Sequence, residues 1–193
     1  MFHNFSAMYA ALAVFWTVFI IIALVCYIFY SIGLYTIAKR RNLRYAGLAW
    51  VPVASLWILG SIADQFDLIT TGINKKLRLV LIWLAVGLCV VSLVYGLIML
   101  ISFSAYSSSY SFNAAMLGLP AFFGLILWGA GITLAVFNFI ALHKLYRSAS
   151  PDNATVFTVL SIIFTIIIPF VVFALRNSDR GVSSVQQNLP LSH

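Results

Sequence analysis

Residues 7–44 read AMYAALAVFWTVFIIIALVCYIFYSIGLYTIAKRRNLR, an apolar run that ends in a cluster of basic residues. The run from Ala7 to Ile37 is longer than the roughly 20 apolar residues that span a bilayer, so it predicts a transmembrane helix. Lys and Arg beside membrane spans accumulate on the cytoplasmic side. The cluster from Lys39 to Arg41 therefore predicts that this helix ends inside and that the N-terminus lies outside.

The same pattern recurs along the whole chain. Hydrophobic residues make up 63% and charged residues 8%, against about 25% charged residues in an average soluble domain. The eleven basic residues form four clusters, each beside an apolar stretch: Lys39, Arg40, Arg41 and Arg44; Lys75, Lys76 and Arg78; Lys144 and Arg147; Arg176 and Arg180. These features predict a single helical membrane domain over residues 1–180 and a disordered polar tail over residues 181–193.

Two further stretches predict full spans. Lys75 to Ile101 runs from inside to outside, and Ala114 to Leu142 returns to the basic cluster at Lys144. Between them, Ser102 to Asn113 carries no charge and predicts a short outer loop.

Both cysteines lie in apolar runs and predict no disulfide framework.

Two shorter apolar segments each contain a proline. Tyr45 to Ile62 contains Pro52 and has basic residues on both sides, which favours a re-entrant or interfacial helix pair on the cytoplasmic side. Ala154 to Leu175 contains Pro169; it predicts either a hairpin that bends at this proline or a further crossing. Ser150-Pro151-Asp152 resembles a helix start. We therefore predict an all-α integral membrane protein with three full spans and two proline-broken segments, or alternatively four to five spans.

The order of these features suggests an internal repeat. A long apolar segment, a basic cluster and a proline-broken segment occur from Ala7 to Asp67 and again from Ala114 to Asp179. The two copies share little residue identity. A structural repeat and a chance recurrence of common membrane features therefore both remain open.

Two stretches resemble an uncharacterised family of small multi-pass membrane proteins from Gram-positive bacteria. They are IAKRRNLRYAGLAWVPVASLWILGSIADQFD, residues 37–67, and LHKLYRSASPDNATVFTVLSIIFTIIIPFVVFALRNSDRG, residues 142–181. The shared pattern is a basic segment, then Leu-Ala-Trp-x-Pro, then Leu-Gly-x-Ile-Ala-Asp. This resemblance implies the bacterial plasma membrane and supplies no mechanism.

Few residues offer catalytic chemistry. The chain has no glutamate, and its three histidines lie outside the apolar runs, so the sequence predicts no metal, no cofactor and no enzyme activity. Asp64 and Asp67 form a close acidic pair. We interpret them either as interfacial residues that pair with Lys75, Lys76 or Arg44, or as a site for a lipid phosphate in a membrane enzyme. Asn138, deep in a span, predicts a hydrogen bond between helices.

The basic and aromatic residues around the first proline-broken segment are the preferred candidate site. They could hold an anionic lipid headgroup: Lys39, Arg40, Arg41, Arg44, Trp50, Trp57, Lys75, Lys76 and Arg78. The expected partners are membrane lipids, a second copy of the chain or another membrane protein, and not nucleic acid. A membrane scaffold or partner subunit is nearly as well supported. A small transporter or channel component is a weaker alternative, because the spans lack ionisable residues.

Overall fold

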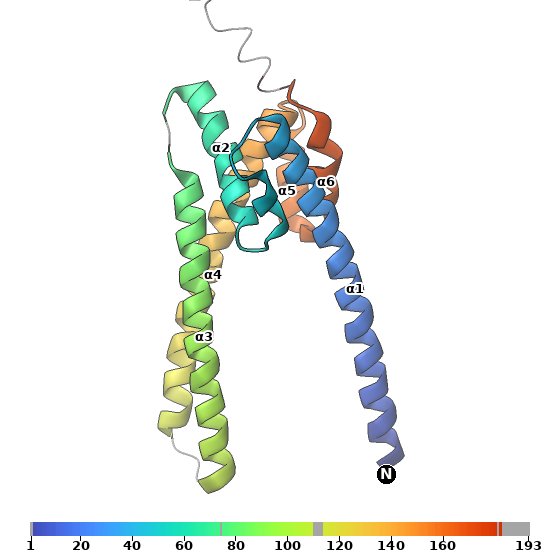
Figure 1. Ribbon diagram of the computed structural model, residues 1–193. Helices are drawn as coiled ribbons and strands as arrows, with labels where there is room; N and C mark the ends of the chain where they lie inside the picture. Colours follow the sequence, from blue (N-terminus) through green and yellow to red (C-terminus); the bar gives the residue numbers. More distant parts are fainter. Residues whose placement is uncertain (1, 74, 110–113, 181, 183–193) are drawn as a thin grey trace, which may run out of the picture. The chain divides into compact units, whose positions relative to one another are not determined.

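The computed structural model describes residues 2–73, 75–109, 114–180 and 182, and these ranges contain helices and no strands (Figure 1). The elements, in chain order, are α1 (Phe2–Arg40), η1 (Ala46–Trp50), α2 (Ser55–Thr71), α3 (Leu77–Ser109), α4 (Ala114–Ala149), α5 (Ala154–Ile163), η2 (Thr165–Ile167), α6 (Ile168–Ala174) and η3 (Leu175–Asn177). The elements named η are short 3₁₀ helices.

Among the described residues, three helices are long and apolar enough to cross a membrane. They are Met8–Arg40, Leu77–Ser104 and Pro120–Ala149, with 33, 28 and 30 residues. At 1.5 Å per residue, each exceeds the roughly 30 Å of a hydrocarbon core. The prediction of an all-α membrane protein with three long spans is confirmed.

The chain forms two compact units. The first unit contains residues 1–51 and 146–193, and the second contains residues 52–145. The last turn of α4 belongs to the first unit. The first unit is therefore assembled from the two ends of the chain, whereas the second is one continuous stretch.

In the first unit, α6 packs against the second half of α1 (Figure 1). Gly33 permits this approach, because a Cβ at that position would lie 2.9 Å from Val172 Cγ1 and 3.0 Å from the backbone nitrogen of Phe173. Next to it, the rings of Phe29 and Phe173 meet edge to face with centroids 4.9 Å apart. A residue without a side chain thus brings the two helices close enough for aromatic packing.

The short helix η1 also packs on α1. After α1 the chain reverses through Asn42 and Tyr45, which both have positive φ. It then runs back along the helix, and the Tyr27 hydroxyl donates a hydrogen bond to the Trp50 carbonyl at 2.5 Å. Tyr27 lies 13 residues before the end of α1, or about 20 Å along the helix. Trp50 therefore lies far from the basic end of α1.

The C-terminal segment of the first unit is a closed hairpin. It leaves α4 at Ala149, and the Ser178 hydroxyl donates back to the Ala149 carbonyl at 2.6 Å. A full crossing between these residues would separate them by about 30 Å, so the alternative of a further span does not fit this geometry. The helix is interrupted at Phe164, with φ −124° and ψ 81°. The predicted bend at Pro169 is wrong in position: this proline lies in the first turn of α6, where its missing N–H costs no hydrogen bond.

In the second unit, α2 packs against the beginning of α3 (Figure 1). At Gly60 a Cβ would lie 2.4 Å from Arg78 Cα, so the contact requires a glycine. Gly72 ends α2 in the left-handed conformation, with φ 68°. The break around Pro52 separates η1 from α2.

Two predicted boundaries are wrong. The predicted outer loop from Ser102 is helical as far as Ser109, because its Ser and Tyr residues include no helix breaker. The predicted helix start at Ser150 belongs to the end of α4 instead: the Ser150 N–H donates to the Tyr146 carbonyl at 2.7 Å. Residues 151–153 then form a turn, and α5 begins at Ala154. The predicted tail lies outside the described residues apart from Val182.

The closed hairpin predicts a specific cross-link. In a chain lacking Cys26 and Cys89, we expect cysteines at positions 149 and 178 to join on mild oxidation in membranes, because Ser178 Oγ lies 2.6 Å from the Ala149 carbonyl. Gel mobility after a unique protease cut between them measures the reaction. Cysteines at positions 154 and 163 are the control, since they lie at the two ends of α5, about 14 Å apart along its axis. Equal cross-linking of both pairs would refute the closed hairpin.

Candidate basic membrane-facing site

Arg41 connects three segments at the end of α1. Its Nη2 donates to Asp179 Oδ1 at 2.8 Å and to the Ser148 hydroxyl at 2.9 Å, and its Nε donates to Asp179 Oδ1 at 3.1 Å. The Arg41 side chain is 7% exposed, so these bonds are shielded from water. Arg41 therefore fixes the ends of α1 and α4 and the C-terminal segment to one another.

Arg40 completes the cluster around Asp179. Its Nη2 lies 3.1 Å from Asp179 Oδ2, and its Nη1 donates to the Arg176 carbonyl at 3.1 Å. Two arginines thus share one carboxylate, which neutralises only one of the two positive charges. We call Arg40, Arg41, Ser148 and Asp179 the Arg41 cluster.

Other cations of the first unit stack on aromatic rings. Lys39 lies over the Tyr35 ring at 5.9 Å and Arg44 over the Tyr45 ring at 5.1 Å. Arg176 lies over Phe173 at 3.7 Å. A cation over a ring keeps its charge and still presents N–H donors, so stacking holds these heads in position without neutralising them.

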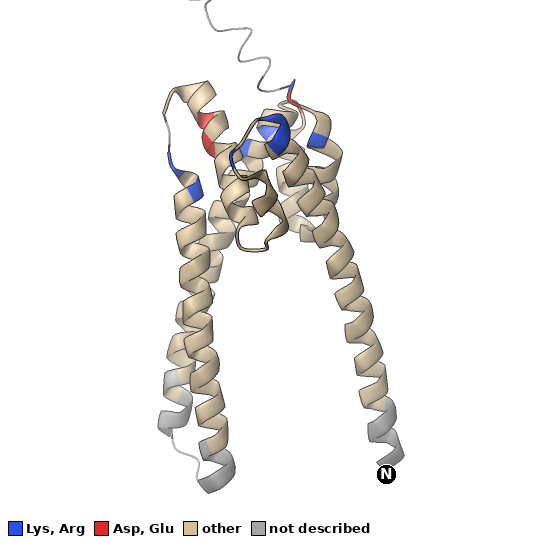
Figure 2. Ribbon diagram, in the orientation of Figure 1, with Lys and Arg blue, Asp and Glu red and all other residues tan. Residues whose placement is uncertain are grey.

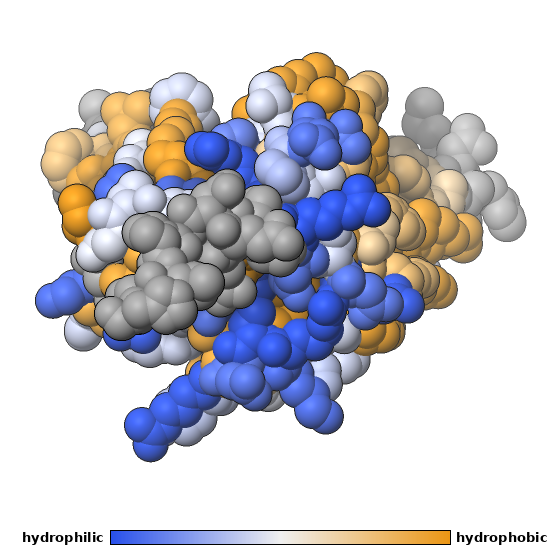
Figure 3. Space-filling view, turned by 90° about the horizontal axis from the view of Figure 1, so that it is seen from above, coloured by the Kyte–Doolittle hydropathy of each residue, from blue (hydrophilic) through white to orange (hydrophobic). Residues whose placement is uncertain are grey.

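The first unit carries most of the positive charge. It contains seven basic and two acidic residues, a formal charge of +5, whereas the second unit contains four basic and two acidic residues, a formal charge of +2. Basic positions gather where α1 ends and where α3 begins (Figure 2). Strongly hydrophilic side chains gather on the face seen from above in Figure 3.

Asp64 caps a neighbouring helix in the second unit. Its carboxylate accepts hydrogen bonds from the backbone N–H groups of Leu77 at 2.6 Å and Arg78 at 3.2 Å. These groups begin α3 and have no partner within their own helix. Arg78 lies 4.0 Å from the same carboxylate and 5.3 Å above the Trp57 ring. Asp64 therefore joins α2 to α3.

Asp67 binds a different helix. Lys144 Nζ of α4 lies 2.5 Å from Asp67 Oδ2, and both side chains are largely buried. The observed basic neighbours, Arg78 for Asp64 and Lys144 for Asp67, were not among the predicted partners. Both carboxylates therefore take part in contacts between helices of the second unit. The described residues contain no group of three His, Cys, Asp or Glu side chains that could hold a metal.

The nine candidate headgroup residues are divided between the two units. Lys39, Arg40, Arg41, Arg44 and Trp50 belong to the first unit, and Trp57, Lys75, Lys76 and Arg78 belong to the second. Sequence reasoning missed Ser148 and Asp179, the partners of Arg41. The sequence did offer a sign for Asp179, because this acidic residue lies between Arg176 and Arg180 of the last basic cluster.

Asn138 does not make the predicted bond through its oxygen. Its Oδ1 is buried and has no hydrogen-bond partner among the described residues.

Comparison of the chain with protein-family models, curated proteins and solved structures finds no match.

The Arg41 cluster predicts unequal effects of two similar substitutions. We expect Arg41→Gln to destabilise the protein by about 2–3 kcal/mol, because it removes charge-assisted bonds from a buried site. Arg44→Gln should leave stability nearly unchanged, because Arg44 is exposed and stacks on one ring. Unfolding by sodium dodecyl sulfate in mild detergent, followed by circular dichroism, measures both. Equal midpoints for the two variants would contradict the structural role of Arg41.

Proposed function

We propose that this protein binds anionic lipid headgroups at the basic end of its first unit and catalyses no reaction. The observation that carries the proposal is the formal charge of +5 on that unit, against +2 on the second. Each Lys or Arg near an anionic membrane surface contributes about 1 kcal/mol of attraction. Several such residues therefore retain lipid headgroups more strongly than one ion pair would.

The positions of the residues support this choice. The Arg41 side chain is 7% exposed and is bonded to Ser148 and Asp179, so it supports the site and does not itself meet lipid. Lys39, Arg44 and Arg147 are exposed and can meet phosphate oxygens directly. Tyr45, which is 61% exposed, adds an aromatic ring of the type that favours the membrane interface.

The proposed location is the bacterial plasma membrane, with the N-terminus outside and the basic clusters inside. The family resemblance and the distribution of Lys and Arg support this arrangement. The lipid-retaining surface then faces the cytoplasmic leaflet. A scaffold role, in which bound lipid helps to recruit a second copy or another membrane protein, is compatible with the same surface.

Lipid retention tests the site. We expect Lys39→Gln with Arg44→Gln to lower the amount of phosphatidylglycerol that remains bound after purification, because both changes remove exposed charge from the first unit. Native mass spectrometry with lipid analysis measures the amount. The matched control, Lys75→Gln with Lys76→Gln, removes the same charge from the second unit and should lower retention less. Equal loss in both variants, or no loss in either, would refute the proposed placement.

Orientation is tested separately in intact cells. In the chain without Cys26 and Cys89, we expect a cysteine at Asn153 to react with a membrane-impermeant maleimide only after permeabilisation. A cysteine at Ser111, between α3 and α4 in the sequence, should react from outside. Asn153 is exposed and makes no side-chain cap bond, so its replacement removes no known contact. External labelling at Asn153 would reverse the proposed orientation.

A further inference from the structure

Asp179 occupies a site made of positively charged donors. Arg40 Nη2 lies 3.1 Å from its Oδ2, while Nη2 and Nε of Arg41 lie 2.8 and 3.1 Å from its Oδ1. The Arg41 side chain is 7% exposed, whereas those of Arg40 and Asp179 are 41% and 29% exposed. All three residues belong to the first unit. This unit therefore contains an anion site that is filled by a carboxylate of the same chain.

The carboxylate does not use all the donors of this site. Nη2 and Nε of Arg41 both donate to the same oxygen, although the guanidinium fork is best matched by two acceptor oxygens. The third nitrogen, Nη1, is buried and has no hydrogen-bond partner within the described part of the chain. A buried charged donor without an acceptor is costly. Because two positive charges also face one negative charge, Asp179 is an incomplete partner for the two arginines.

A terminal phosphate group matches these donors better. Such a group has three unesterified oxygens and a charge of about −1.5 to −2 at pH 7. Two of its oxygens can bind the fork of Arg41 while the third meets Arg40, and its charge balances that of both arginines. A phosphodiester, like a carboxylate, offers only two unesterified oxygens and one negative charge. The donor set therefore favours a terminal phosphate over both of these groups.

Asp179 lies where its carboxylate can leave without unwinding any of the helices α1 to α6. It follows the end of η3 by two residues, and the preceding Ser178 is extended, with φ −106° and ψ 131°. The hydrogen bond from the Ser178 hydroxyl to the Ala149 carbonyl lies directly beside it. Displacement of Asp179 therefore strains this bond and loosens the end of the C-terminal hairpin.

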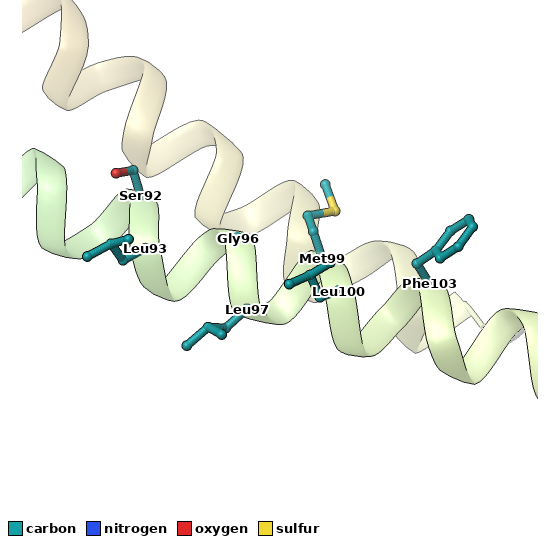
Figure 4. Close-up of a pocket in the computed structure, with 7 residues that line it drawn as sticks. All are labelled: Ser92, Leu93, Gly96, Leu97, Met99, Leu100 and Phe103. Carbon is teal, nitrogen blue, oxygen red and sulfur yellow. The ribbon is translucent and has the colours of Figure 1, made fainter.

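The apolar groove on α3, in the second unit, offers no such donors (Figure 4). Ser92 is the one lining residue with a polar side chain, and it donates to the Cys89 carbonyl at 2.8 Å. Leu93 and Phe103 are 71% and 73% exposed, as on a surface that lipid tails cover. The lining residues all come from α3: Ser92, Leu93, Gly96, Leu97, Met99, Leu100 and Phe103.

From this geometry we propose that Arg40 and Arg41 bind a terminal phosphate group and that Asp179 is an internal competitor for the same site. The phosphate replaces the carboxylate and frees the C-terminal hairpin from the end of α1. Arg41 meets a phosphate only after Asp179 has left. The group can belong to a soluble compound or to a lipid such as phosphatidic acid, because both present the same three oxygens. The lipid retention proposed above uses exposed cations and leaves Asp179 in place, so the two proposals are independent.

Removal of the competitor tests this site. A hydrogen bond to a charged group changes an equilibrium roughly 10- to 100-fold, so we expect Asp179→Ala to bind radiolabelled inorganic phosphate more tightly by a factor in this range. Equilibrium dialysis of the purified full chain in detergent measures the affinity. The matched control is Asp152→Ala, which removes the other acidic residue of the first unit, an exposed one. An equal gain in both variants would overturn the proposal, because it would show a general effect of charge.

Two lipids distinguish the source of the phosphate. In phosphatidylcholine nanodiscs, we expect Asp179→Ala to retain more phosphatidic acid than the unchanged chain, and no more phosphatidylglycerol, whose phosphate is a diester. Native mass spectrometry measures the bound lipid. A gain with only one of the two phosphate compounds, inorganic phosphate or phosphatidic acid, identifies the source. A gain with neither, or equal gains for the two lipids, would overturn the proposal.

A second measurement keeps Asp179 in the chain. With cysteines at positions 149 and 178, we expect inorganic phosphate or phosphatidic acid to slow the oxidation that joins them, because displacement of Asp179 loosens the hairpin. Chloride at the same ionic strength, which screens charge equally, and phosphatidylglycerol are the respective controls. Equal rates for each phosphate compound and its control would show that Asp179 is not displaced, and the proposal would be wrong.

Discussion

The guanidinium of Arg41 is the contact on which the first unit depends. One buried cation holds Asp179 and Ser148, and thereby joins segments more than 100 residues apart in the sequence. Without it, the Ser148 hydroxyl, on a buried residue, and the Asp179 carboxylate would each lose a charge-assisted hydrogen bond. The hairpin can also break its helix at Phe164 because its two ends are held in place.

The spans followed from composition, because long apolar runs leave a chain in a membrane few alternatives. Lys39 to Arg41 marked the end of α1 to within one residue. Boundaries in polar stretches were less certain, since Ser and Tyr residues after Ile101 can continue a helix or leave it. Partners were the hardest to predict: the pairing of Asp67 with Lys144 depends on how α2 meets α4, and local sequence carries no record of that contact.

Proline alone was a poor guide to where a helix breaks. Pro52 does lie between η1 and α2, but Pro169 begins a helix that was already interrupted at Phe164. The tolerated position of a proline is the first turn, so a proline in an apolar run marks a new helix as readily as a bend. Glycine was more informative in packing, because Gly33 and Gly60 lie where backbones approach most closely.

The discontinuous first unit has a consequence for biosynthesis. The second unit, residues 52–145, is complete once α4 has been translated, and its contacts can form while the ribosome is still at work. Arg41 is made early, but Asp179 follows it by 138 residues. The nascent chain must therefore carry an arginine without its carboxylate partner at the end of this helix until residue 179 has been synthesised. A chain released before Ser178 would leave that charge and the Ala149 carbonyl exposed, a defect that membrane quality-control proteases could recognise.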